Sequence, residues 1–420
     1  MDIGVAFCDR RPFHADDSIR GESLSLLRER RAFRWDYILV AVVILLTLVG
    51  LVTLYSASYL FALNQPWRFG SRGGWTPIYS NFVVVVIMLA LFPILALVNL
   101  DLFKRRWVVF GLVMATIVLN LLPFVPFLRH SGFAPDANVM RWIIIRTGNG
   151  GFVSFQPSEL IKFVLPLYLA YILDKNGDRL NKFPHGPLPP ALVTGVFCLL
   201  MYLQNNFSEM VLIVLISLAV CFVAGMHRGW FGFAAVLAVA TGYVLTFGNR
   251  DGRWFRRLDM FFNPAQDASG GMTQIDMSLE AIRAGGFLGR GIGQGTLKTR
   301  IPEVHGDFVF ASFAEEFGLL GVFLHLVLLG AFAGISFYIV SRNRNMFSQL
   351  LGFGLVAPIV MQTLLNVAVV ANAVPTTGVA LPFVSSGGSS LLITLCASAL
   401  LVNLARRHVL SLDEEDRYVG

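Results

Sequence analysis

Long apolar runs separated by short polar segments recur along the whole chain. Ten of them have the length of a membrane-spanning helix, which needs roughly 20 mainly apolar residues. These runs lie at about 37–60, 79–98, 107–124, 157–173, 188–203, 208–225, 231–247, 312–340, 348–371 and 389–405. They are continuously apolar rather than alternating, which excludes a closed β-barrel. Only 14% of the residues are charged, against about 25% in soluble domains. The pattern predicts an all-α polytopic membrane protein with one membrane domain, residues 37–407.

The distribution of Lys and Arg in the short loops predicts how the chain is oriented. Cytoplasmic loops carry an excess of these residues. Here they gather in the N-terminal tail, in alternate loops and after the last run, at 28–34, 104–106, 175–182, 228, 342–344 and 406–407. We therefore expect both termini in the cytoplasm, with tails at 1–36 and 408–420. An even number of spans agrees, because it returns the chain to its starting side.

The segment between the seventh and eighth runs, at about 248–311, departs from this charge pattern. Its predicted place is extracytoplasmic, yet it is rich in arginine. Long loops cross the membrane largely regardless of charge, so the predicted topology stands. Two explanations of the arginines stay open. They contact anionic lipid headgroups, or they bind an anionic substrate, for which Arg253 and Arg257 are candidates.

The stretch IPEVHGDFVFASFAEEFG, at 301–318, gathers five titratable side chains: Glu303, His305, Asp307, Glu315 and Glu316. The last two lie near the start of the eighth run. A carboxylate inside the hydrocarbon costs about 2.5–3.5 kcal/mol or more, so such groups face a cavity, water or a partner. We expect Glu315 and Glu316 either to pair with loop arginines or to act in catalysis. The first three lack the spacing of a metal-binding motif, so no dedicated metal site is predicted.

A segment rich in serine and glycine, at 366–392, precedes the last run. Its prolines and glycines interrupt the helical pattern, which predicts irregular backbone at the membrane surface. Such backbone is tolerated only when it is buried in protein or lines a wet cavity. A helix N-terminus also favours anions. Ser385, Ser389 and Ser390 are therefore either substrate-binding residues or ordinary capping serines in a re-entrant loop.

Two further stretches carry local signals. In QPSELIKF, 156–163, Pro157 and Glu159 are typical of a helix start. Lys162 follows about one turn later, and it either snorkels to the surface or points a cation into a cavity. The glycine-rich GFLGRGIGQG, 286–295, is not part of a βαβ unit, so it gives only a very weak indication of a dinucleotide site.

Taken together and in order, these motifs resemble the SEDS family of bacterial shape, elongation, division and sporulation proteins. The matching segments are RWI followed by QPSELIK, GFLGRGIGQG running into PEVHGDFVFASFAEEFGLLG, and PTTGVALPFVSSGGSSLL. The resemblance covers about 37–407. It implies a peptidoglycan glycosyltransferase of the cytoplasmic (inner) membrane that polymerises lipid II on the outer face and releases undecaprenyl pyrophosphate. It also implies a class B penicillin-binding protein as partner, with other divisome or elongasome proteins.

The resemblance also assigns roles to individual residues. It makes Asp307 the essential catalytic aspartate. The other matching positions are the acidic Glu303, the imidazole of His305, the arginine before tryptophan at Arg141, the helix-four Lys162 and the segment Ser385–Ser390. Whether a divalent cation, Mg²⁺ or Mn²⁺, assists the pyrophosphate is left open. PTTG and the short C-terminus are more similar to the division member FtsW than to the elongation member RodA.

The sequence departs from the family pattern at several positions. The family's QPDLGTA is here QNNFSEM, 204–210, so that Asn206 replaces the acidic residue and Glu209 is an additional acid without an evident role. Threonine and tyrosine are replaced by Gly306 and Ser386, and none of these changes touches Asp307. Three rival functions stay open: an elongation-type polymerase, a lipid II flippase and a scaffold for division proteins. Nucleic-acid binding is not expected, because the net charge of +7 follows the topology rather than one face.

Overall fold

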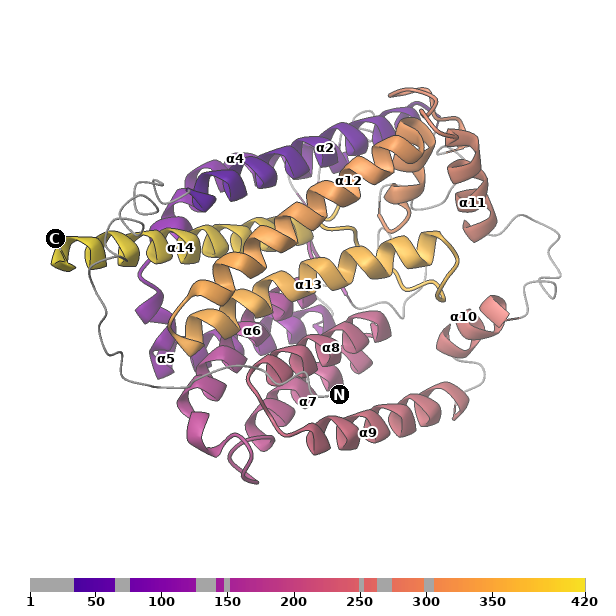
Figure 1. The fold of residues 1–420 in the computed structure, drawn as a ribbon. Helices are drawn as coiled ribbons and strands as arrows, with labels where there is room; N and C mark the ends of the chain where they lie inside the picture. The colour runs from indigo at the N-terminus through magenta and orange to yellow at the C-terminus, as the bar shows by residue number, and fades with distance from the viewer. Residues whose placement is uncertain are drawn as a thin grey trace, which may run out of the picture.

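The computed structural model describes residues 34–64, 76–125, 141–146, 152–248, 253–262, 274–297 and 306–419. Most of this part of the chain is helical, and the long helices lie side by side (Figure 1). Each of the ten predicted apolar runs falls on a different one of them. These helices are α2 (Trp35–Asn64), α4 (Thr76–Leu97), α5 (Arg106–Leu121), α6 (Ser158–Lys175), α7 (Leu188–Leu203), α8 (Phe207–Val223), α9 (Arg228–Phe247), α12 (Val309–Arg342), α13 (Met346–Val370) and α14 (Gly388–Val419).

Several of these helices have the length and hydropathy of membrane spans. Within the described residues, five segments are long and apolar enough to cross a membrane: Trp35–Ala57, Arg106–Phe124, Val309–Arg342, Met346–Val370 and Gly388–Arg407. Shorter apolar helices occupy Asn81–Leu97, Leu188–Leu203, Phe207–Val223 and Arg228–Val244. The chain is therefore a multi-pass membrane protein. The count of ten spans stays a prediction.

The prediction of an all-α protein overlooked a small β-hairpin. Strand β1 (Ile143–Arg146) pairs antiparallel with β2 (Phe152–Phe155), and Ile143 lies opposite Phe155. The sequence carries the signal for it, because a β-branched run and an aromatic one flank the glycine-rich TGNGG. The hairpin lies directly before α6 and brings the residues at its first strand toward the start of that helix.

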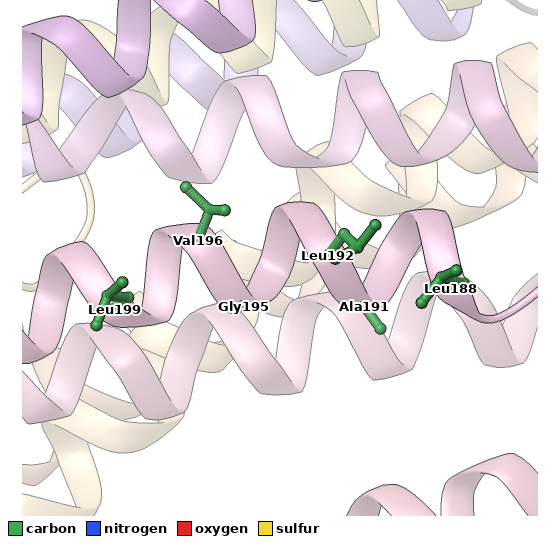
Figure 2. A pocket seen from close by; sticks show the side chains of 6 residues that line it. All are labelled: Leu188, Ala191, Leu192, Gly195, Val196 and Leu199. Carbon is green, nitrogen blue, oxygen red and sulfur yellow. The ribbon is translucent and has the colours of Figure 1, made fainter.

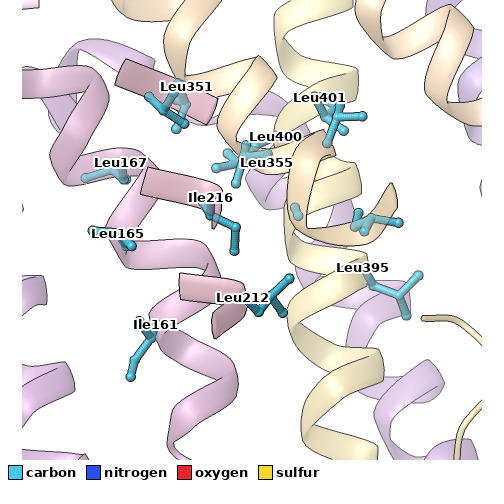
Figure 3. Packing of buried hydrophobic residues seen from close by; sticks show 14 of the residues in the cluster. Ile161, Leu165, Leu167, Leu212, Ile216, Leu351, Leu355, Leu395, Leu400 and Leu401 are labelled. Carbon is cyan, nitrogen blue, oxygen red and sulfur yellow. The ribbon is translucent and has the colours of Figure 1, made fainter. Parts of the chain in front are cut away.

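The core lies where α6, α8, α13 and α14 meet (Figure 3). Leucine and isoleucine side chains from all four helices interlock there, including Leu165, Ile216, Leu355 and Leu400. By contrast, α9 lies at the margin of the bundle (Figure 1) and exposes large apolar side chains such as Val239, which is 72% exposed. In a bilayer we expect acyl chains to cover that face, since lipid is as apolar as these side chains.

The two ends of the bundle differ in what they carry. At one end, Arg407 Nη2 donates to Asn99 Oδ1 over 2.8 Å, and Lys104 lies 5.6 Å from the Phe347 ring centroid. These contacts bring together the 3₁₀ helix η2 (Leu100–Lys104), the start of α13 and Arg407 in the C-terminal half of α14. Three segments that the charge pattern assigns to one side of the membrane therefore share one end. The assignment of that side to the cytoplasm stays a prediction.

The opposite end carries the short helices α10 (Arg253–Phe262) and α11 (Gln274–Gly285), both inside the predicted large loop (Figure 1). It also carries the irregular segment 371–387 between α13 and α14. Val379, Leu381 and Phe383 are each at most 2% exposed, so the second half of this segment is buried in protein, whereas residues 371–378 are exposed or half-buried. At the C-terminus, α14 runs on as a helix to Val419, so the predicted tail at 408–420 begins within a helix.

Candidate functional site

Asp307 lies in the turn before α12 and is half-buried. Two side chains fix the backbone there. Asn366 Nδ2 donates to the carbonyl oxygens of Asp307 and Val379, both over 2.8 Å. Ser385 Oγ donates to the Gly306 carbonyl over 2.9 Å and accepts from the Leu381 amide over 2.7 Å. The predicted catalytic residue is therefore held against the segment 371–387, which follows it by more than 60 residues.

The Asp307 carboxylate lies close to Gly378. A Cβ atom added at Gly378 would sit 3.1 Å from Asp307 Oδ2, and the glycine has a φ of +75°. L-residues other than glycine rarely adopt this left-handed conformation. Glycine is therefore required here twice, once by the turn of the chain and once by the closeness of the carboxylate.

The same segment is held from two further directions. Arg257 Nη1, from α10, donates to the carbonyl oxygens of Thr376 and Thr377 over 3.2 and 3.4 Å. Ser208 Oγ, from the first turn of α8, donates to the Thr377 carbonyl as well. Residues 376–378 therefore join α8, α10 and the Asp307 turn. This places Arg257, a predicted substrate-binding residue, at the candidate site, while its predicted contact with substrate stays a prediction.

Lys162 lies in a buried ionic cluster instead of snorkelling to the surface. Its Nζ atom is 2.7 Å from Glu159 Oε2 and 3.3 Å from Glu209 Oε1, and the three side chains are only 3–4% exposed. Arg141 lies near enough to act electrostatically on Glu209, and its Nη2 donates to the carbonyl of Asn205. The structure thus brings together two predicted substrate-binding residues, Arg141 and Lys162, with the acid that had no evident role.

The predicted anion-binding serines have mainly structural contacts. Ser385 joins the Asp307 turn to its own segment, as described above, and Ser389 Oγ accepts from the Gln156 amide over 3.3 Å. This second bond links the starts of α14 and α6. Ser390 Oγ is buried and has no hydrogen-bond partner within the described residues. Binding of substrate by these serines stays a prediction.

Glu315 and Glu316 pair within the protein, which confirms the interpretation that Glu315 pairs with a loop arginine. Glu315 Oε1 accepts from the amides of Thr296 and Leu297 over 2.7 and 3.1 Å, and Arg290 Nη1 lies 3.3 Å away. Glu316 Oε1 accepts from Ser56 Oγ over 2.5 Å. Both glutamates are almost fully buried. They therefore attach the end of the large loop and α2 to α12.

The glycine-rich segment 286–295 packs against a break in α12. At Gly318 the helix is interrupted, with a φ of 64° and a ψ of −170°. The amides of Leu319 and Leu320, next to the break, donate to the carbonyls of Gly286 and Phe287 over 2.9 and 3.1 Å. These contacts account for the glycines structurally, so that the segment needs no nucleotide to explain it.

Three predicted site residues are beyond direct description. Glu303 and His305 lie outside the described residues, and Arg253 begins α10 with a side chain that is likewise outside them. Within the described part of the chain, no group of three or more His, Cys, Asp or Glu side chains is arranged to hold a metal ion. Whether a divalent cation assists the pyrophosphate therefore stays an open question.

Sequence reasoning did not assign a role to Asn366, Ser208 or Glu209. Asn366 is 1% exposed within a largely apolar helix, and a buried amide in such a helix signals a specific hydrogen-bond partner. Ser208 carried no usable signal. Glu209 stood out only as an acid beside an apolar run, and its partner Lys162 lies 47 residues away in sequence.

An apolar groove on the outer face of α7 is separate from this site. It has a volume of about 330 Å³ and is lined by Leu188, Ala191, Leu192, Gly195, Val196 and Leu199 (Figure 2). These side chains offer no polar group for catalysis. Because they repeat at helical spacing on one exposed face, we expect them to contact lipid acyl chains.

The comparisons with known proteins agree with the sequence motifs. The probable peptidoglycan glycosyltransferase FtsW of Geobacter sp. (strain M18) is 32% identical over 381 residues, which are 90% of this chain and 98% of the relative. The protein of the same name from Bacillus subtilis (strain 168) is 31% identical over 389 residues, covering 88% and 90% of the two chains.

Solved structures have the same fold. A chain from a structure described as "Structural coordination of polymerization and crosslinking by a peptidoglycan synthase complex" has a TM-score of 0.70 and 25% identity, covering 89% of this chain and 98% of that one. The rod shape determining protein RodA of Thermus thermophilus has a TM-score of 0.59 and 24% identity, covering 90% and 98%. The profile of the FtsW/RodA/SpoVE family, described as Cell cycle protein, matches residues 36–409. The chain belongs to this FtsW/RodA/SpoVE family of cell cycle proteins.

Proposed function

We propose that this protein is a peptidoglycan glycosyltransferase that polymerises lipid II into glycan strands during cell division. Two findings support the proposal together. The relatives named above are peptidoglycan glycosyltransferases of the FtsW type. In addition, the family motif marks Asp307 as essential, and the structure holds it at one end of the bundle. Asn366 of α13 bonds the Asp307 backbone, and α8 and α10 bond the neighbouring segment 371–387. This last arrangement carries the proposal, because a general base must be held in a fixed position.

Asp307 acts as the general base in the proposed reaction. Its carboxylate accepts the proton of the acceptor sugar's 4-hydroxyl while that oxygen attacks the anomeric carbon of the donor. The new bond is the glycosidic C–O bond, and the bond that breaks joins the anomeric carbon to the undecaprenyl pyrophosphate. Direct displacement inverts the anomeric centre, turning an α-linked donor into a β-linked glycan.

The leaving group explains why one carboxylate is enough. Hydrolysis of a glycoside requires a second carboxyl group as acid, because an alkoxide leaves poorly. Pyrophosphate leaves as a stable anion and needs cations rather than a proton donor. Arginines of the predicted outer loop, among them Arg257, are suited to this, since α10 places that residue beside the Asp307 segment.

The setting of the reaction follows from the substrate. Lipid II is a polyprenyl pyrophosphate in the outer leaflet, so the Asp307 end of the bundle faces the outside of the cytoplasmic membrane. A class B penicillin-binding protein then cross-links the strands as they form. A solved structure of this fold comes from work on a peptidoglycan synthase complex that coordinates polymerization and crosslinking, which supports such a partner.

Reconstitution tests the proposal. The protein is purified with a class B penicillin-binding protein from the same organism, supplied with lipid II, and its products are separated on a gel. We expect strands from the wild type and a loss of about 10²–10⁴ in rate for Asp307→Asn, the usual effect of removing a general base. The control is Asp101→Asn, which removes an exposed aspartate from η2 at the other end of the bundle.

Three outcomes would contradict the proposal. An Asp307→Asn rate within about threefold of the wild type would remove the residue from the chemistry. Strands from neither protein, with lipid II nonetheless crossing vesicle membranes, would make the protein a flippase. Neither activity, with a partner complex that still assembles, would leave it a scaffold.

A further inference from the structure

Glu209 and Lys162 join two helices at the candidate site. Glu209 lies in the first turn of α8 and Lys162 one turn into α6, and their ion pair of 3.3 Å is almost entirely shielded from solvent. Glu159 contacts the same ammonium over 2.7 Å, but from within α6 itself. The Glu209 pair is therefore the contact through which this cluster connects α6 to α8.

Glu209 is the partner of Lys162 that comes from outside α6. The Lys162 ammonium lies between two buried carboxylates, Glu159 of its own helix and Glu209 of α8, and Arg141 acts electrostatically on Glu209. Neutralising Glu209 leaves Lys162 paired with Glu159 of its own helix and removes the ion pair that links the start of α8 to α6. The start of α8 should therefore become less firmly held.

The start of α8 is also one of the supports of the Asp307 segment. Ser208, the neighbour of Glu209, donates to the carbonyl of Thr377. The next residue is Gly378, where an added Cβ atom would sit 3.1 Å from Asp307 Oδ2. The first turn of α8 thus lies between Lys162 and the segment beside the proposed base.

We propose that Glu209 is a positioning residue for polymerisation. By pairing with Lys162 it fixes the first turn of α8, and through Ser208 it fixes the segment on which Asp307 rests. This inference rests on the proposed function, since it concerns the geometry of the same base. The inference also gives Lys162 a role in holding the site in place, because two carboxylates already pair with its ammonium group.

Asn206 suggests why the acid stands at 209 in this chain. The family segment QPDLGTA has its acid at the position of Asn206, three residues before Glu209. Asn206 directly precedes α8, with a φ of −111° and a ψ of 65°, and Glu209 lies in the first turn of that helix. Asn206 is 3% exposed, and its Nδ2 atom has no hydrogen-bond partner within the described residues. The chain therefore keeps a buried acid at the start of α8 but supplies it three residues later.

Relocating the charge tests the inference. Lipid II polymerisation is measured for Glu209→Gln, for Glu209→Gln combined with Asn206→Asp, and for the control Ser217→Ala. The control breaks another buried polar contact of α8, the 2.8 Å bond from Thr194 Oγ1 to Ser217 Oγ, far from the segment 371–387. A displacement of about 1 Å can cost about 10²-fold in rate.

We expect Glu209→Gln to lower kcat by roughly 30- to 100-fold with little change in KM, because the base is displaced while substrate contacts remain. Amide hydrogen exchange across 371–387 should accelerate in this variant and not in Ser217→Ala. Adding Asn206→Asp should restore kcat to within about fivefold of the wild type and slow the exchange again. If Glu209→Gln does not survive purification, Glu209→Asp, which retracts the charge by one methylene, should show the same loss in milder form.

Other results overturn the inference. The first is a kcat within about threefold of the wild type for Glu209→Gln, or for Glu209→Asp if that variant is used in its place. A change confined to KM would make the cluster a direct binding site instead. A double variant that melts like the wild type but polymerises no better than Glu209→Gln would also contradict it. A wild type without polymerase activity would refute the proposed function itself, which is a distinct result.

Discussion

Asn366 is the residue whose removal should most directly loosen the proposed base. Its amide donates to the carbonyls of Asp307 and Val379, and so joins the two segments directly at the base. Asn366→Ala leaves both carbonyls without this donor. An unsatisfied buried carbonyl costs about 1–3 kcal/mol. Val379 is 1% exposed, whereas the Asp307 carbonyl is only partly buried and can gain water. The loss should therefore total about 2–4 kcal/mol.

The same substitution should lower kcat as well as stability. Without Asn366, the turn of Asp307 loses this link to 371–387 and keeps the Ser385 bond to the neighbouring Gly306. A base displaced by up to 1 Å loses up to about 10²-fold in rate, so we expect at least a tenfold loss of kcat per folded molecule. Thermal unfolding measures the stability and the lipid II gel assay measures kcat.

Asn403 provides a matched control for this prediction. Its Nδ2 atom also donates to two backbone carbonyls, those of Leu95 and Val98, over 2.9 and 2.8 Å, and the residue is 2% exposed. It lies in α14 toward the other end of the bundle. Asn403→Ala should cost similar stability and leave kcat per folded molecule near that of the wild type. Equal losses of kcat in both variants, or none in Asn366→Ala, would refute the reasoning.

Three glycine and glutamate substitutions give further tests. Gly378→Ala should reduce polymerisation at least tenfold, because its Cβ would crowd Asp307 Oδ2 at 3.1 Å. Gly293→Ala is the control and should not have this effect, since Gly293 has a similar φ of +82° but open space around it. Gly318→Ala should sharply lower the unfolding temperature, since its Cβ would sit 2.2 Å from the Gly289 amide nitrogen, whereas Gly330→Ala meets nothing within 4 Å and should be tolerated. Glu315→Ala should cost about 2–4 kcal/mol of stability by depriving two backbone amides of their acceptor, and an unchanged melting curve would contradict this.

Features that depend on neighbouring residues were predicted well from the sequence. The apolar runs fall on helices. A continuously apolar stretch forms a helix whether protein or lipid covers it, so that this prediction needs no information from elsewhere in the chain. The start of α6 at Ser158 was predicted from Pro157 and Glu159, since capping is decided within one turn. The β-hairpin was overlooked although its signal is local, because two four-residue strands are easily lost among long apolar runs.

The same distinction between local and distant interactions applies to the residues of the site. The motif around Asp307 marked that residue from the sequence, and the irregular backbone of 371–387 was predicted from its prolines and glycines. The partners of both were not predicted. Lys162 was expected to be a snorkelling or cavity-facing cation, and nothing local to it identifies Glu209, which lies 47 residues on in another helix. Asn366 likewise acquires its function only from the approach of Asp307, 59 residues earlier in the chain.

The sequence by itself therefore determined the class of the protein, the places of its helices and the identity of its proposed base. The tertiary structure alone decided which groups hold that base: Asn366, Ser208 and, through Lys162, Glu209. The physical reason is the range of each interaction. Hydropathy and capping act within one segment, whereas hydrogen bonds and ion pairs form over about 3 Å between groups that only the packing of distant helices brings together.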